Sequence, residues 1–184
     1  MSAPRNQLAK KIPAVRLLPH VVEATAHARQ LGTAAGASVG VLNKVALELI
    51  DGGQLDTSWP LLDQAMAIAE VQLGPDHPAT LTTRSNLARW LVEAGQVQEA
   101  IIQFRRLLDD YVRVLGPDHP DTLTTRNNLA YLLGEAGQVQ EAITEFRRLL
   151  DDYVRVLGPD HPATLRTRSH LAHWEELLNH ESSN

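Results

Sequence analysis

The sequence has no cysteine in its 184 residues. This absence excludes disulfide bonds and thiolate metal sites, and it fits a reducing compartment. The chain also lacks an excess of positive charge, since its net charge is −5 and its pI is near 5.9. Nucleic-acid-binding proteins usually carry a basic patch, so we expect no nucleic-acid partner.

Long apolar runs and catalytic motifs are missing as well. No run approaches the roughly 20 apolar residues that cross a bilayer, and residues 1–20 contain no apolar segment of a secretory signal. The sequence holds no phosphate loop G-x-x-x-x-G-K-[ST], no G-x-S-x-G and no H-E-x-x-H, so it predicts no catalytic residue, cofactor or metal. We expect a soluble, cytoplasmic, helical protein that is not an enzyme and has no membrane partner.

Residues 1–16 are basic and contain no acidic residue. We interpret them as a flexible lead-in, or as the cut end of a longer chain, because termini are usually poorly ordered. An arm that binds nucleic acid or a membrane is the alternative.

The main feature of the sequence is an internal repeat. Residues 79–120 and 121–162 differ at seven of their 42 positions, so the other 35 match. Pro75, Pro117 and Pro159 recur at the same step of 42. A fixed period of this length indicates a stacked array in which no unit buries its apolar face alone.

Apolar residues at helical spacing divide the chain into half a unit, three full units and half a unit. In the leading half unit, 17–32, the pair Leu31-Gly32 falls 42 residues before Leu73-Gly74. The single array covers 17–180, with full units at about 36–74, 78–116 and 120–158, a capping helix at 162–179 and a polar tail at 181–184. Within the units we expect helices at about 37–50, 57–73, 78–94, 97–115, 120–136 and 139–157.

The link Leu-Gly-Pro-Asp-His-Pro stops one helix and starts the next. Glycine permits the turn at the end of a helix, and proline is favoured in the first turn of the next one. The aspartate or the histidine of each link can cap the free N–H groups of that helix. The histidines also invite a metal-site interpretation, but each lies in a separate link without a ligand cluster, so capping is favoured. The residues concerned are Asp76, Asp118 and Asp160 with His77, His119 and His161.

The second helix of each unit is amphipathic. In residues 139–157 apolar side chains recur at steps of three and four, which is the pattern of a core face. The opposite side is charged, and we expect surface ion pairs Arg147–Asp151 and Arg148–Asp152 at i, i+4.

The first helix of each unit carries a polar stripe beside its packing face. In residues 120–136 the stripe falls at offsets 0, 3, 4, 7 and 11, which place it on one side of the helix. Because the other first helices repeat it, stacking would align the stripes into one surface. The candidates are, helix by helix, Asn43, Lys44 and Leu47; Thr82, Ser85, Asn86, Arg89 and Glu93; Thr124, Asn127, Asn128, Tyr131 and Glu135; and Arg166, His170 and His173.

The units resemble the tetratricopeptide repeat (TPR). Its signature is matched by Leu129-Ala130, Leu133, Gly137, Ala142, Phe146 and Leu149, and again by Leu87-Ala88, Leu91, Gly95, Ala100, Phe104 and Leu107. In the first unit Ser58 and Leu62 replace the alanine and the aromatic residue. The period exceeds the usual value of about 34, and with the link and the Asn-Asn-Leu-Ala run it resembles the kinesin-light-chain type.

The resemblance implies an all-α fold: a right-handed superhelix of antiparallel helix pairs with a C-terminal capping helix. It also implies that the first helices line a concave groove, which would make the polar stripes a binding surface for a protein or an extended peptide. The opening LLPHVVEATAHARQLG followed by such units further resembles the sensor array of bacterial, especially actinobacterial, NB-ARC signal-transduction ATPases. The chain lacks the phosphate loop of those ATPases, so only a sensor or scaffold role carries over.

Several side chains of the stripes suit peptide recognition. Asn86, Asn127 and Asn128 both donate and accept hydrogen bonds, so they can pair with a peptide backbone of any sequence. Arg89, Lys44 and Arg166 offer charge-assisted bonds to a carboxylate, while Tyr131 and Leu47 offer apolar contact. Alternatively, these residues face solvent or bridge neighbouring helices.

Two further patterns have open alternatives. His170, His173 and Glu176 lie on one helical face and have a spacing that suits a metal, although a pair of histidines on a helix is common. Trp90 and Trp174 occupy equivalent positions, and we expect them to pack between successive helices rather than to stack on bases.

Two of the seven differences between the near-identical units, Ser85/Asn127 and Arg89/Tyr131, fall on the stripe. This concentration favours a recognition surface. The leading hypothesis is therefore a non-catalytic module that binds a protein or peptide in the groove. The alternative is a structural module that self-associates by stacking its open ends, where near-identical units expose similar apolar faces.

Overall fold

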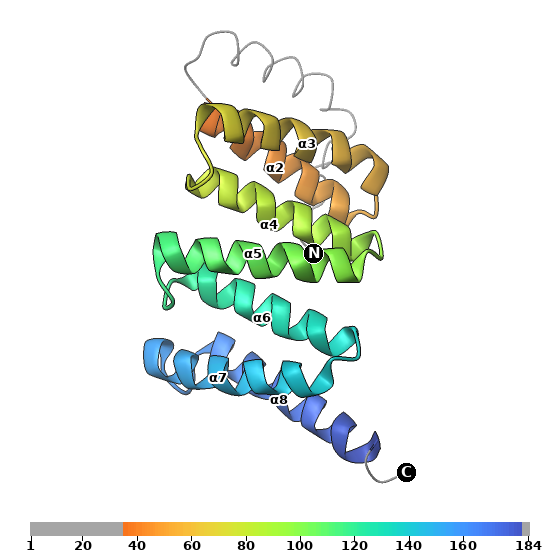
Figure 1. Cartoon of the computed structure of the whole chain (residues 1–184), viewed down its shortest axis with the longest axis vertical. Helices are drawn as coiled ribbons and strands as arrows, with labels where there is room; N and C mark the ends of the chain where they lie inside the picture. Colours follow the sequence, from red (N-terminus) through yellow and green to blue (C-terminus); the bar gives the residue numbers. More distant parts are fainter. Residues whose placement is uncertain (1–34, 182–184) are drawn as a thin grey trace, which may run out of the picture.

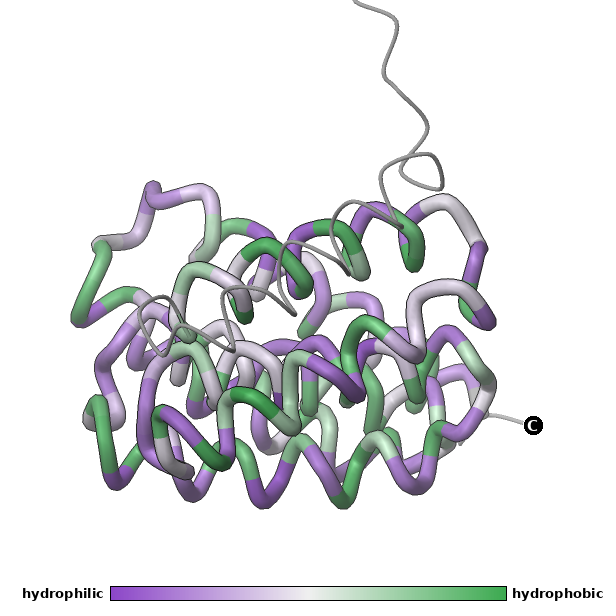
Figure 2. Tube along the Cα trace, turned by 90° about the horizontal axis from the view of Figure 1, so that it is seen from above, coloured by the Kyte–Doolittle hydropathy of each residue, from purple (hydrophilic) through white to green (hydrophobic). Residues whose placement is uncertain are grey.

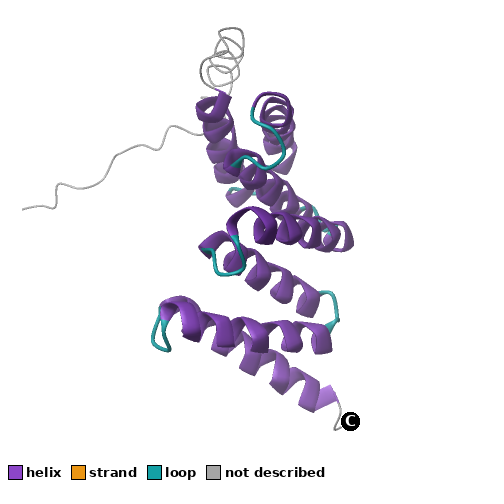
Figure 3. Cartoon of the chain, turned by 60° about the vertical axis from the view of Figure 1, so that its left-hand side comes forward, coloured by secondary structure: helices purple, strands orange, loops and turns teal. Residues whose placement is uncertain are grey.

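The computed structural model describes residues 35–181. This part of the chain consists of seven α-helices joined by short loops, without a strand (Figure 3). The basic residues 1–16, the half unit 17–32 and the tail residues 182–184 lie outside it. The helices are α2 (Ala35–Asp51), α3 (Leu55–Gln72), α4 (Pro78–Glu93), α5 (Val97–Leu115), α6 (Pro120–Glu135), α7 (Val139–Leu157) and α8 (Pro162–Glu181).

The helices stack in chain order along the long axis of the molecule, as Figure 1 shows, and form an all-α repeat superhelix. Their bounds agree with the expected ones to within two residues, and α5 and α7 begin and end where the sequence predicts. Each full unit contributes a first helix (α2, α4, α6) and a second helix (α3, α5, α7), and α8 is the first helix of a further unit.

Apolar and hydrophilic residues are interspersed along the trace, as Figure 2 shows. The residues buried between neighbouring helices are mainly apolar. The apolar faces of α4 to α8 join in one core, in which Phe146 is fully buried. The apolar faces of α2 and α3 form a second core, against which Leu87 and Trp90 of α4 pack. Stacking thus buries surface that no single unit could cover.

Histidine, not aspartate, caps each helix after a link. The Nδ1 atom of His77 accepts a hydrogen bond from the backbone N–H of Ala79 at 3.1 Å. The same bond joins His119 to Asp121 and His161 to Ala163, both at 3.2 Å. Each cap satisfies one of the N–H groups that a helix start leaves without a partner.

A buried threonine fixes each link from within. The hydroxyl group of Thr122 donates to the carbonyl of Gly116 at 2.8 Å, and Thr80 and Thr164 make the same bond to the preceding links. Gly116 has a φ of 92°, in the left-handed region where a side chain would be strained. The link therefore needs both its glycine and its threonine.

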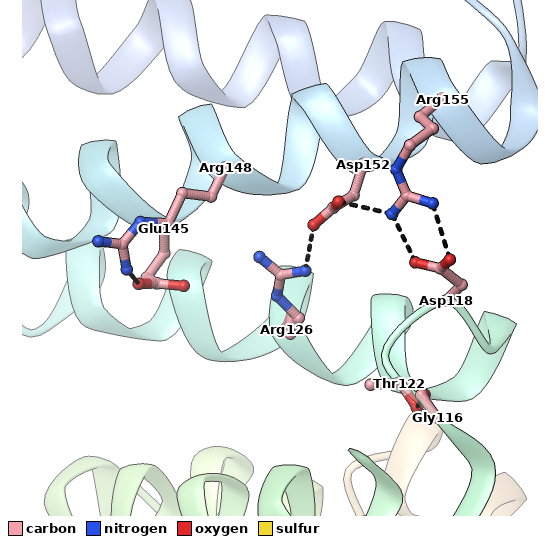
Figure 4. Close-up of polar contacts among 8 residues, drawn as sticks. All are labelled: Gly116, Asp118, Thr122, Arg126, Glu145, Arg148, Asp152 and Arg155. Carbon is pink, nitrogen blue, oxygen red and sulfur yellow. Dashed lines mark hydrogen bonds and ion pairs between the residues drawn. The ribbon is translucent and has the colours of Figure 1, made fainter.

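The aspartates of the first two links bind arginines of the second helices. Arg155 of α7 makes hydrogen bonds of 2.6 and 2.7 Å to Asp118, as drawn in Figure 4. Arg113 of α5 holds Asp76 in the same way. The hydrogen bond from the arginine lowers the pKa of each of these aspartates. Each pair ties a second helix to the link that precedes its unit.

The expected ion pairs within α7 are wrong. Arg147 binds Glu175 of α8 at 2.6 Å, and Arg148 binds Glu145 at 3.1 Å. Asp152 is held by Arg126 of α6 at 2.6 Å and by Arg155 at 2.8 Å. Arg147 and Asp152 thus find partners on neighbouring helices, which spacing along one helix does not reveal, and the pairs that form within α7 are at i, i+3 instead of i, i+4.

Candidate partner-binding groove

The first helices face a hollow of about 490 Å³, which we call the groove. The stripes of α4 and α6 form its two sides, and α8 contributes one histidine. Its polar lining residues are Ser85, Asn86, Arg89, Asn127, Asn128, Tyr131 and His170. The structure therefore brings together seven of the side chains that the sequence singled out.

The floor of the groove is apolar. It is lined by Phe104 of α5, which is 4% exposed, together with Val92 of α4 and Leu132 of α6. Phe104 is one of the TPR signature residues, and the sequence did not indicate that it lines the groove. Val92 and Leu132 lie within three residues of the stripe positions Arg89 and Tyr131, which is the one signal that pointed to them.

An aromatic cluster closes the groove toward α8. The ring of His170 lies 5.5 Å from that of Tyr131 and 5.5 Å from that of Phe146. Its Nδ1 atom is buried and has no hydrogen-bond partner among the described residues. Burial lowers the pKa of His170 below its usual value, with smaller contributions from the positive charge of Arg166 and from His173. His170 is therefore uncharged at neutral pH.

Tyr131 is the most exposed aromatic residue of the cluster, at 43%. A hydrogen bond to Glu135 raises the pKa of its hydroxyl group. The ring thus keeps one face toward the groove while its polar end is occupied by Glu135, one helical turn away.

Arg89 lies in the groove, but a carboxylate already binds its guanidinium group. Asp51 at the end of α2 forms an ion pair with it. A ligand carboxylate would have to displace Asp51, so the expectation that Arg89 is free to bind one does not fit this geometry.

Asn43 does not face the groove. It is 5% exposed, and its Nδ2 atom donates to the hydroxyl group of Thr83 at 2.8 Å, which joins α2 to α4. We therefore leave Asn43 out of the groove: it bridges neighbouring helices, the alternative that the sequence left open.

A smaller hollow of about 170 Å³ adjoins the groove between α6 and α8. Thr124 and Arg166 line it, and they share it with Asn127, Asn128 and His170. Arg166 is exposed and has no carboxylate partner within residues 35–181. The remaining candidates lie outside both hollows, and they are Lys44, Leu47, Thr82, Glu93, Glu135 and His173.

The histidine pair of α8 does not converge on one point. His170 turns toward Tyr131 and Phe146, while His173 packs its ring on Trp174 with centroids 5.0 Å apart. Among the described residues, no group of three potential ligands is placed to hold a metal ion. Within the same residues, no helix is both long and apolar enough to cross a membrane.

A third hollow, of about 770 Å³, lies between the second helices α3 and α5 over α4, and sequence reasoning missed it. Trp59 lines it, and its ring lies 4.6 Å from that of Trp90. The indole N–H of Trp90 donates to the carbonyl of Leu55 at 3.1 Å. Trp90 thus packs between helices, as expected, and so does Trp174, which is 4% exposed.

Comparison with known proteins identifies the repeat. Family models described as tetratricopeptide repeat match residues 40–111 and 122–163. The chain is a tetratricopeptide-repeat protein. Such repeats generally mediate interactions between proteins. A comparison with curated proteins gave no match.

Solved structures support the kinesin-light-chain type of TPR. A crystal structure of a Podosopora anserina putative kinesin light chain with nearly identical TPR-like repeats superposes with a TM-score of 0.68 at 28% identity, over 76% of this chain and 66% of that one. A second structure of that protein gives 0.68 at 26%, over 92% and 85%. BtubC (BKLC) from P. vanneervenii gives 0.72 at 18%, over 91% and 66%, and this likeness shows the TPR fold alone.

Proposed function

We propose that this TPR protein is a non-catalytic scaffold or sensor that binds an extended protein segment in its groove. The observation that carries the proposal is the groove itself, in which the amides of Asn86, Asn127 and Asn128 surround an apolar floor at Phe104. Amide side chains can pair with both the N–H and the C=O groups of an extended backbone. The floor offers a place for one apolar side chain of the partner.

The charges of the groove favour a neutral segment over an acidic one. Asp51 neutralises Arg89, and His170 is uncharged at neutral pH because burial lowers its pKa. Binding should therefore depend weakly on salt concentration. Among the described residues that line the groove and the smaller hollow, Arg166 is the one arginine without a carboxylate partner, so a partner carboxylate would bind there.

The test uses a displayed library of random peptides selected on the immobilised full chain. Selected peptides should share an apolar residue, and they should lose about tenfold or more in affinity for a variant with Asn86→Ala, Asn127→Ala and Asn128→Ala. Circular dichroism checks that the variant keeps its helices. Equal affinity for a folded triple variant would reject the groove.

A second candidate function is self-association through the open ends of the array. The supporting observation is Leu165 on α8, which is 45% exposed. Light scattering across a concentration series tests this function, because a strict monomer at all concentrations would reject it.

A sensor role within an NB-ARC ATPase is the finer form of the proposal. It rests on the resemblance of residues 17–32, which lie outside the described part of the chain. The coding sequence directly upstream tests it: a nucleotide-binding module there supports the sensor role, and an unrelated gene in its place counts against it.

A further inference from the structure

The outer face of α8 lacks the cover that the repeat gives to its other first helices. Leu165 is 45% exposed, whereas the equivalent Leu123 and Leu81, one and two repeats earlier, are 1% and 0% exposed. Ala172 is exposed in the same way, whereas the equivalent Ala88 and Ala130 are fully buried. In α4 and α6 the next second helix covers this face.

The covering helix makes three kinds of contact with the first helix and its link, and its ion pairs recur in both near-identical units. Leu149 and Tyr153 of α7 pack in one cluster with Leu123 of α6. Arg126 of α6 binds Asp152 of α7, and Asp118 of the link binds Arg155 (Figure 4).

The preceding repeat has the same ion pairs between equivalent residues. Arg84 of α4 binds Asp110 of α5 at 2.9 Å, and Asp76 binds Arg113 at 2.6 Å. Each of these first helices, with the link before it, therefore binds the covering helix through one apolar contact, one arginine and one aspartate.

The last link and α8 retain the aspartate, the leucine and the arginine that bind a covering helix in the earlier repeats. Asp160, Leu165 and Arg168 stand 42 residues after Asp118, Leu123 and Arg126. Within residues 35–181, neither Asp160 nor Arg168 has an ion-pair partner. An arginine and an aspartate flanking an exposed leucine form a surface that complements a helix carrying the opposite charges.

We propose that this face of α8 binds a separate amphipathic helix of the α7 type. The pattern that fits is Phe-x-x-Leu-x-x-Asp-Tyr-x-Arg, as in residues 146–155 and 104–113. The aspartate of that helix binds Arg168, its arginine binds Asp160, and its leucine and tyrosine cover Leu165. The helix belongs to another protein chain.

The chain's own leading segment fits the pattern poorly. At the positions that correspond to Phe104, Leu107 and Tyr111, two repeats earlier, the sequence has His20, Glu23 and His27. Alanine takes the place of the aspartate, and only Arg29 matches the pattern. A second copy of this chain therefore offers one of the two charges and little of the apolar contact.

The probe is a fluorescein-labelled peptide with the sequence of residues 137–158, titrated with the full chain in fluorescence anisotropy. We expect saturable binding that falls about tenfold or more with Arg168→Asp, because the peptide aspartate then meets a like charge. A peptide with Asp152→Arg should recover binding to the Arg168→Asp protein. Arg166→Asp is the matched control, since it reverses a charge on the groove side of the same helix and should change little.

The charge swap excludes one artefact. A peptide that displaced the internal α7 would meet Arg126, which the Arg168→Asp variant leaves unchanged. No binding, or binding that Arg168→Asp leaves unaltered, would overturn the proposal. Dimers of the wild-type chain that dissociate on Arg168→Asp would also overturn it, because the chain's own segment would then occupy the face. Binding of groove peptides should survive Arg168→Asp, which separates this proposal from the proposed function.

Discussion

Gly134 of α6 and Trp174 of α8 fit together so closely that a Cβ atom on Gly134 would overlap the six-membered ring of the tryptophan. One repeat earlier the equivalent positions are Val92 and Leu132, which both line the groove. From one repeat to the next, valine is thus replaced by the smaller glycine on one first helix, and leucine is replaced by the larger tryptophan on the following first helix. This exchange seats α8 against α6 and brings His170 to the groove.

Gly134→Ala should destabilise the protein. Alanine improves helix propensity by about 1 kcal/mol, but overpacking against a buried tryptophan costs about 1–3 kcal/mol. Trp174 is 4% exposed and packed in the core, so it has little room to move. Urea unfolding followed by circular dichroism measures the change.

The control for this prediction is the same substitution in a Trp174→Leu background, which copies the leucine of the preceding repeat. Without the overlap, Gly134→Ala should stabilise by about 1 kcal/mol through helix propensity alone. A loss of equal size in both backgrounds would show that the tryptophan is not the cause.

Arg126→Met and Arg168→Met form a matched pair at equivalent positions of α6 and α8. The side chain of Arg126 is 15% exposed and binds Asp152, so its loss leaves a carboxylate short of a partner and should cost about 1–3 kcal/mol. Arg168 is exposed and should cost little in the free chain. Urea unfolding of both variants checks this, and equal losses would contradict the account of the interface between α6 and α7.

The cap at His119 should be replaceable by a shorter acceptor. His119→Ala removes the hydrogen bond to the N–H of Asp121 and should cost about 0.5–2 kcal/mol. His119→Asn keeps an acceptor at the N-cap and should recover most of that loss. Thermal unfolding compares the three proteins, and an asparagine variant as unstable as the alanine variant would argue against capping.

Stability should fall as the pH drops through about 6.5, the pKa of an unfolded histidine, because of His170. Its pKa is lowered in the folded protein, so below about pH 6.5 the unfolded chain takes up a proton that the folded chain does not. The stabilising contribution is complete above the unfolded pKa and is lost as the pH falls toward the folded pKa. His170→Gln should flatten this part of the stability profile, measured by urea unfolding at each pH.

The sequence predicted the helices because their limits are local. The glycine and proline of each link end and start a helix through backbone geometry, and the apolar spacing of α5 and α7 identifies their core faces. The same periodicity predicted that Asn86, Asn127 and Asn128 lie on one polar side of their helices. Helix ends and helix faces depend on residues that are close in sequence, and the repeat provides the same residues in each unit.

The sequence could not predict how far apart successive first helices lie. Asn43 and Asn127 hold equivalent positions, yet Asn43 bonds Thr83 between closely packed helices while Asn127 lines a hollow. Arg89 pairs with Asp51, 38 residues away, for the same reason. Helix separation depends on which side chains meet across the interface, such as Gly134 and Trp174, and periodicity alone does not contain that information.

We propose above that the groove binds an extended segment through its amides. The most direct test of this proposal is the affinity of one library-selected peptide for four proteins: the wild type, Asn127→Ala with Asn128→Ala, Phe104→Leu, and Gln140→Ala as a control exposed on α7 outside the groove. We expect losses of about tenfold or more for the amide pair, a smaller loss for Phe104→Leu and none for Gln140→Ala. Unchanged affinity of the folded amide variant would contradict it.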